Sequence, residues 1–111
     1  MVETPGFLAA AKAAGVPDSV RREIVTAVAS RPELGELVVG TGGLRKFRVA
    51  RLGAGKSGGF RVLSYYLGEN FPVFLIGVFA KNQKDNLTAA ERVEVAKRLK
   101  TVTETYGART R

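Results

Sequence analysis

Residues 60–80, FRVLSYYLGENFPVFLIGVFA, contain two strand patterns around which the rest of the chain is organised. Residues 60–67 and 73–80 are rich in β-branched and aromatic side chains. Gly68-Glu69-Asn70 between them is typical of a turn. The second pattern is apolar almost throughout, which predicts a central strand covered on both faces.

A further strand pattern precedes this pair at residues 44–51. Because side chains alternate between the two faces of a strand, Phe47 and Val49 are expected on one face, and Lys46 and Arg48 on the other. A Gly-rich basic loop joins this strand to the next one. The pattern therefore predicts a hairpin with one apolar face and one basic face.

Helix patterns precede the strands. The Ala-rich residues 7–14 stop at Gly15, a common residue after the end of a helix. Asp18 is the predicted N-cap of a second helix, which ends near Pro32. Its buried stripe is predicted from helical spacing: Val20, Ile24, Ala27 and Val28.

A C-terminal helix is predicted from Thr88-Ala89-Ala90-Glu91, which has the form of a capping box. The helix is expected to end near Gly107 and to bury an apolar stripe: Val95, Leu99, Val102 and Tyr106. The order of elements predicts the α+β class in a single compact domain over residues 1–111, with N-terminal helices, an antiparallel sheet of three to four strands, and a C-terminal helix.

The composition excludes several kinds of chemistry. The chain has 111 residues with no Cys and no His, which excludes disulfides, thiolate zinc sites and catalysis by Ser–His or Cys–His pairs. The acidic residues are scattered, so no metal site and no cofactor is expected. No apolar run approaches the ~20 residues needed to cross a bilayer. We expect a soluble, cytoplasmic protein.

The charge is strongly uneven along the chain. The net charge is +8, but residues 44–111 hold 14 Lys and Arg against five Asp and Glu, a net of +9. Within that part, residues 44–61 hold six bases and no acid. A segment with charges of one sign favours a polyanionic partner, and nucleic acid is the favoured one. The alternatives are a basic surface kept for solubility and an acidic protein partner.

Gly55-Lys56-Ser57 is similar to the end of a phosphate-binding loop of the form G-x-x-x-x-G-K-[ST]. However, Ala50 stands where the first Gly belongs, and a strand pattern follows where the motif requires a helix. We therefore interpret the segment as a hairpin loop that presents Lys56.

Arg61 lies within a strand pattern, with Leu63 and Tyr65 on its face, and its forked donors match phosphate oxygens. The alternative is a structural Arg paired with a carboxylate. A polar segment at residues 79–86 follows the central strand and is either part of a site or an ordinary loop. Four aromatic residues are candidates for stacking on bases or for the core: Tyr65, Tyr66, Phe71 and Phe79.

Three segments in combination resemble toxins of the RelE/HigB type, members of the RelE/ParE superfamily, from bacterial toxin–antitoxin modules. They are Gly43-Leu44-Arg45-Lys46-Phe47-Arg48, Gly55-Lys56-Ser57-Gly58-Gly59-Phe60-Arg61-Val62, and Val78-Phe79-Ala80-Lys81-Asn82-Gln83-Lys84-Asp85-Asn86-Leu87-Thr88. The resemblance covers roughly residues 30–105. It implies a RelE-like fold and ribosome-dependent cleavage of messenger RNA in the decoding site. It also implies attack by the ribose 2′-oxygen, which leaves a 2′,3′-cyclic phosphate and a free 5′-hydroxyl.

The resemblance also implies roles for basic residues of this chain. The positions that match the family's catalytic bases are Lys56, Arg61, Lys81 and Lys84. The hairpin bases expected to hold RNA are Arg45, Lys46, Arg48 and Arg51. Because some members use His and a C-terminal Tyr or Asp, this chain without His must follow an all-basic variant, and Tyr106 is expected in the buried stripe.

The partners implied are the 70S ribosome with its mRNA and a cognate antitoxin, often a helix-turn-helix protein that carries the complex to operator DNA. No membrane partner is expected. Two other functions remain open at this point. The chain could inhibit DNA gyrase, as ParE-type proteins of the same fold do, although that branch usually lacks the basic set. It could also be an RNA-binding module with no chemistry, for which salt-sensitive binding is expected.

Overall fold

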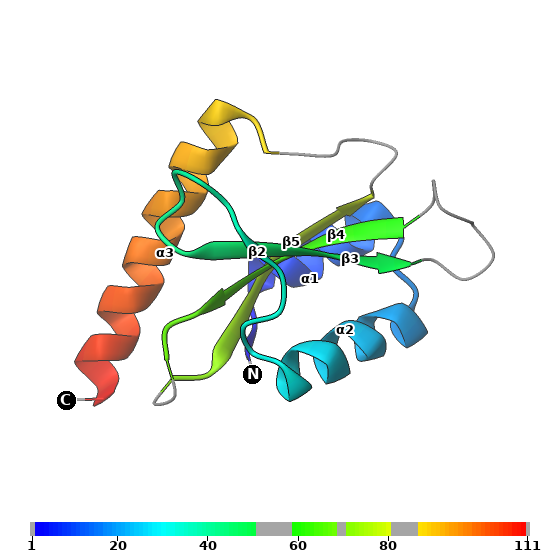
Figure 1. The fold of residues 1–111 in the computed structure, drawn as a ribbon, viewed down its shortest axis with the longest axis horizontal. Helices are drawn as coiled ribbons and strands as arrows, with labels where there is room; N and C mark the ends of the chain where they lie inside the picture. Colours follow the sequence, from blue (N-terminus) through cyan, green and yellow to red (C-terminus); the bar gives the residue numbers. More distant parts are fainter. Residues whose placement is uncertain (1, 51–58, 69–70, 81–86, 111) are drawn as a thin grey trace.

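Figure 1 shows a twisted sheet with two helices on one face and a long C-terminal helix on the other. The computed structural model describes residues 2–50, 59–68, 71–80 and 87–110. The helices are α1 (Pro5–Ala14), α2 (Asp18–Ser30) and α3 (Ala89–Thr110). The strands are β1 (Val2–Glu3), β2 (Glu36–Leu37), β3 (Leu44–Ala50), β4 (Gly59–Tyr66) and β5 (Val73–Ala80), in the order β1-β5-β4-β3-β2.

The predicted α+β class is confirmed, but the sheet differs from the expected one. Among the described residues the sheet has five strands instead of three to four, and it is mixed because β1 runs parallel to β5. The two additional strands, β1 and β2, have two residues each, so they carry no alternating pattern that a sequence could display. The apolar strand β5 is interior and buried as predicted, although β4 is the middle strand.

The ends of the two N-terminal helices are fixed by residues close to them in the sequence. The Thr4 hydroxyl accepts a hydrogen bond from the Phe7 amide at 3.2 Å, and Gly15, with φ of 70°, ends α1 in the left-handed conformation. The predicted N-cap of α2 is wrong, because Asp18 is the first helical residue. The carbonyl of Pro17 accepts the first intrahelical bond from Arg21, so Pro17 is the cap.

One core lies between these two helices and the sheet. Phe7 of α1 and Ile24 of α2 are fully buried against Phe60, Val62 and Leu75 of the sheet. Three of the four residues in the predicted α2 stripe are buried, and Ala27 is half-buried. Thus the helical spacing identified the face that packs on the sheet.

A second core lies between the opposite face of the sheet and α3. Leu99 is 2% exposed against this face, with Val95 and Val102 half-buried beside it. The Tyr65 hydroxyl lies 3.1 Å from the Thr103 hydroxyl and adds a polar contact between strand and helix. The predicted capping box is confirmed by two bonds: the Thr88 amide donates to the Glu91 carboxylate at 2.9 Å, and the Glu91 amide donates to the Thr88 hydroxyl at 3.1 Å.

The predicted end of the C-terminal helix is wrong, because α3 continues past Gly107 to Thr110. A Gly inside a helix costs only about 1 kcal/mol relative to Ala, so a single Gly is a weak stop signal. The prediction for the Tyr106 side chain lies outside the described side chains.

Two features require a glycine at position 35, just before β2: its backbone conformation and the closeness of the Lys46 main chain. Its φ is 102°, and an added Cβ would lie 2.9 Å from the Lys46 carbonyl carbon. Gly35→Ala is expected to lower the free energy of unfolding by on the order of 3 kcal/mol, from backbone strain plus the backbone clash. Urea unfolding monitored by circular dichroism measures this.

The matched control is Gly40→Ala. Gly40 has φ of 82°, but an added Cβ would meet nothing within 4 Å. Only backbone strain should then act, at a cost of roughly 1–2 kcal/mol. Equal losses in the two variants would show that the approach of Gly35 to Lys46 does not matter for stability.

Candidate functional site

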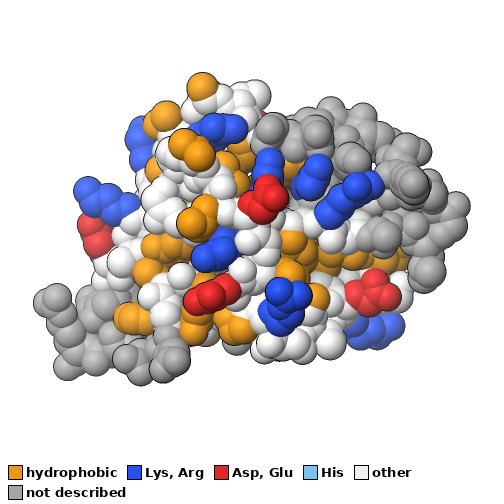
Figure 2. Space-filling view, in the orientation of Figure 1, with side chains coloured by type: hydrophobic (Ala, Val, Ile, Leu, Met, Phe, Trp, Pro, Cys, Tyr) orange, Lys and Arg blue, Asp and Glu red, His pale blue; other side chains and the backbone are white. Residues whose placement is uncertain are grey.

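The sheet face that faces α3 carries a group of bases beyond the helix-covered part. Lys46 and Arg48 of β3 alternate with the buried Phe47, as the sequence predicted. Arg61 of β4 is paired directly opposite Arg48. We call Lys46, Arg48 and Arg61 the basic face. Figure 2 shows several Lys and Arg side chains close together at the upper right of the view, with an acidic side chain beside them.

The register brings these bases into two neighbouring rows across the sheet. One row joins Arg48, Arg61 and Phe79. The next joins Glu36, Lys46, Leu63 and Gly77, so Lys46 has an acidic residue directly opposite it on β2. Directly opposed residues have Cβ atoms about 4.5–5.5 Å apart, so Arg48 and Arg61 lie within reach of one phosphate group. Two like charges in opposed positions repel each other, and a phosphate bound between them would offset that repulsion.

Arg61 is held by the strand rather than by a loop. It is half-buried, and Leu63 and Tyr65 on its face are buried, as the sequence predicted. Arg61, like Lys46 and Arg48, also has an interaction within the protein. A guanidinium carried by a strand among buried neighbours can present its forked donors in a defined direction.

Arg45 lies on the other side of the sheet from the basic face. It is paired with the buried Ser64, and its Nη1 donates to the Gly35 carbonyl at 3.1 Å. The structure therefore separates Arg45 from Lys46 and Arg48, with which the sequence grouped it. Its observed contact ties β3 to the segment before β2.

Four other predicted site residues lie outside the described residues: Arg51, Lys56, Lys81 and Lys84. The described strand ends nevertheless locate where their segments attach. Ala50 pairs with Gly59, and Phe60 pairs with Ala80. The ends of β3 and β5 and the start of β4 thus meet at one end of the sheet, which is also the end where Arg48 and Arg61 lie.

The aromatic candidates have different environments. Tyr65 is 8% exposed and bonded to α3, so it belongs to the core. Tyr66 packs on the core formed by α1 and α2, on the other side of the sheet. Phe79, by contrast, is half-buried and adjoins Arg61 across the strand pair, so it is the aromatic residue next to the basic face.

One part of the site was missed by the sequence analysis. A cavity beside β5 lies between α1 and α3. Its lining residues come from α1 (Gly6 and Ala10), from the sheet (among them Leu63 and Phe79) and from α3 (Glu91, Glu94, Val95 and Arg98). The residues from α3 recur at intervals of three and four, which is the signal that places them on one face of a helix. That signal does not say which part of the sheet the face lies against.

Two further searches concern the described residues only. None of their helices is both long enough and apolar enough to span a membrane. Within the same part of the chain, no three acidic, His or Cys side chains come together as ligands for a metal ion.

A family model described as "RelE toxin of RelE / RelB toxin-antitoxin system" matches residues 6–109. The chain belongs to the RelE toxin family. It is therefore a toxin of a toxin–antitoxin system, and RelE membership implies an antitoxin partner. RelE toxins are known in general as endoribonucleases, and the basic face is the part of this RelE chain that suits a polyanionic substrate.

Proposed function

We propose that this RelE-family toxin is a ribosome-dependent endoribonuclease that cleaves mRNA in the decoding site of the 70S ribosome. The observation that supports this most is the directly opposed pair Arg48 and Arg61 on an open sheet face, with Lys46 in the next row. Two fixed cations that face each other across a strand pair can bind the two non-bridging oxygens of one phosphate.

In the proposed reaction, a base removes the proton of a ribose 2′-hydroxyl, and the 2′-oxygen attacks the adjacent phosphorus. The bond from phosphorus to the 5′-oxygen breaks, and that oxygen takes up a proton to leave as a hydroxyl. The products are a 2′,3′-cyclic phosphate and a 5′-hydroxyl end. Negative charge gathers on the phosphate in the transition state, where a preorganised donor such as Arg61 contributes about 3 kcal/mol.

The base and acid must come from residues other than His, because the chain has none. The proposed candidates are Lys56, Lys81 and Lys84, whose segments join the sheet at the end where Arg48 and Arg61 lie. Neighbouring cations lower the pKa of a Lys ammonium and so favour its neutral, basic form. Lys side chains are sufficient as the acid and the base of the cleavage when the ribosome holds the message in a reactive conformation.

The proposed setting is the bacterial cytoplasm, where the ribosome is the site of action. The antitoxin that RelE membership implies is proposed to be a helix-turn-helix protein. The toxin would then contact operator DNA only through the toxin–antitoxin complex. A net charge of +8 suits both RNA and an acidic segment of such an antitoxin.

The test is incubation of purified toxin with 70S ribosomes programmed with a defined message and a tRNA in the P site. Cleavage within the A-site codon, with a 2′,3′-cyclic phosphate end, is the expected result. Intact message at micromolar toxin would refute the proposal. Inhibited gyrase supercoiling without cleavage would support the ParE-type alternative, and salt-sensitive RNA binding alone would support a non-catalytic module.

A further inference from the structure

The cavity beside β5, between α1 and α3, is lined by residues that neighbour the basic face in the sheet. Phe79, which lines it, is the cross-strand partner of Arg61. Leu63, which also lines it, lies two positions after Arg61 on the same face of β4. Two residues that line the cavity are therefore neighbours of Arg61 in the sheet, and Arg61 is the residue that we propose to bind the scissile phosphate.

The chemistry of the cavity is apolar at its floor and charged at its rim. Leu63, Phe79 and Val95 belong to the core beneath α3, and Glu94 and Arg98 come from the exposed side of the helix. A flat apolar surface with an aromatic side chain and a few polar groups is how proteins hold an unstacked RNA base.

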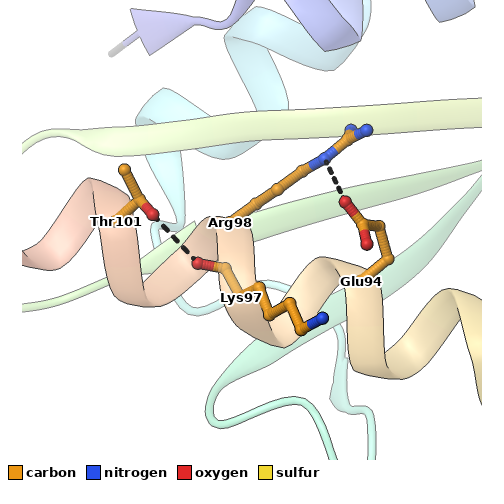
Figure 3. A network of polar contacts seen from close by, with 4 residues as sticks. All are labelled: Glu94, Lys97, Arg98 and Thr101. Carbon is orange, nitrogen blue, oxygen red and sulfur yellow. Dashed lines mark hydrogen bonds and ion pairs between the residues drawn. The ribbon is translucent and has the colours of Figure 1, made fainter.

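Glu94 is available to a ligand because its present partner is weak. Its Oε1 lies 3.9 Å from the Arg98 Nε, and both side chains are about 60% exposed, at 60% and 62%. Exposed pairs of this kind contribute little to stability, so a ligand can replace Arg98. Figure 3 shows Arg98 extending from α3 toward the strands, with Glu94 beside it one turn earlier. The Thr101 hydroxyl donates to the Lys97 carbonyl at 3.2 Å.

We propose that this cavity holds the base next to the scissile phosphate and that Glu94 selects guanine there. The inference rests on the proposed function, because Arg61 must hold that phosphate. A carboxylate has two acceptor oxygens, and guanine presents two adjacent donors, its N1–H and its N2 amino group. Uracil offers one ring N–H beside two carbonyl oxygens, which a carboxylate repels.

The size of the cavity favours a base over a folded protein segment. Its volume is about 270 Å³, just under the roughly 300–1,000 Å³ typical of sites for small molecules. The guanidinium of Arg98 lines both this cavity and the next one along α3, which extends toward Thr4 and Val102. Arg98 thus divides the space beside α3 into compartments, so a continuous peptide would have to displace it.

The experiment uses the purified full-length toxin labelled with ¹⁵N and two dinucleotides, GpG and UpU. Both carry 2′-O-methyl groups, so neither can be cleaved. Two-dimensional NMR is expected to show shifts at Gly77, Leu87 and Glu94, with GpG bound at least tenfold more tightly than UpU, as for a good bidentate base contact. Glu94→Gln should abolish this preference, and Glu104→Gln, exposed and later on α3, should retain it.

The binding experiment tests the guanine proposal separately from the cleavage reaction. Equal affinities for GpG and UpU, or an unchanged preference in Glu94→Gln, would overturn it even if the toxin cleaves ribosome-bound mRNA. Shifts at the cavity with the antitoxin but not with either dinucleotide would also overturn it and would assign the cavity to the protein partner. A guanine preference at the cavity would stand even if no cleavage is found, and only the proposed reaction would then fail.

Discussion

Arg61→Ala is expected to slow cleavage of ribosome-bound mRNA by about 10²–10³-fold, the loss found when one preorganised donor to a developing charge is removed. The substitution removes the interaction of Arg61 within the protein, but it also removes the opposed positive charges of Arg48 and Arg61, so the fold should stay intact. The measurement is the rate of message cleavage in single-turnover assays on programmed ribosomes. Urea unfolding of the same preparation shows whether the fold is intact.

Two further variants serve as controls for Arg61→Ala: one keeps the charge, and the other removes an Arg far from the basic face. Arg61→Lys keeps the charge but loses the forked donors, so an intermediate rate is expected. Arg22→Ala removes an exposed Arg from α2, on the helix-covered face opposite the basic face, and should cleave at the full rate. An Arg61→Ala protein that cleaves as fast as the unaltered toxin would remove Arg61 from the reaction.

Leu99→Ala is expected to lower the free energy of unfolding by about 2–5 kcal/mol, the usual cost of truncating a buried Leu. Leu99 is 2% exposed, whereas Val95 and Val102 on the same helix are only half-buried. It therefore supplies most of the fully buried surface that holds α3 on the sheet within the described residues. Urea unfolding gives the stability, and hydrogen exchange gives the protection of α3 amides.

Val93→Ala is the matched control on the same helix. Val93 is 56% exposed, so its loss should change the free energy of unfolding by no more than about 0.5 kcal/mol. If Leu99→Ala unfolds at the same urea concentration as Val93→Ala, the contact of α3 with the sheet does not depend on Leu99.

The long elements were predictable because their patterns are local. The apolar run of β5, the alternation of β3 and the capping box at Thr88 each require only neighbouring residues to be recognised. The short strands β1 and β2 were not predictable. They form because β5 and β3 offer edges, and an edge is a property of the folded sheet and not of two residues.

The candidate site was predictable to the extent that it lies on one strand pair. Alternation in β3 separated Lys46 and Arg48 from Phe47, and the structure adds the register that opposes Arg48 to Arg61. Alternation also placed Arg45 on the face of Phe47. It was grouped with the RNA-binding bases because it lies in the same basic segment and because of the family resemblance, and neither of these gives the direction of a side chain. The cavity beside Glu94 required the position of α3 over β5, which no local pattern contains.

The parallel strand β1 has a consequence for the order of events during translation. Val2 and Glu3 pair with Phe74 and Leu75, and the Thr4 hydroxyl donates to the Leu75 carbonyl at 2.7 Å, 71 residues later in the chain. At 5–20 residues per second, the ribosome needs roughly 4–14 s to synthesise that interval. Because contacts so distant in sequence form late in folding, a nascent toxin spends most of its own synthesis without a finished sheet. The delay is long enough for an antitoxin already present to meet the toxin as it folds.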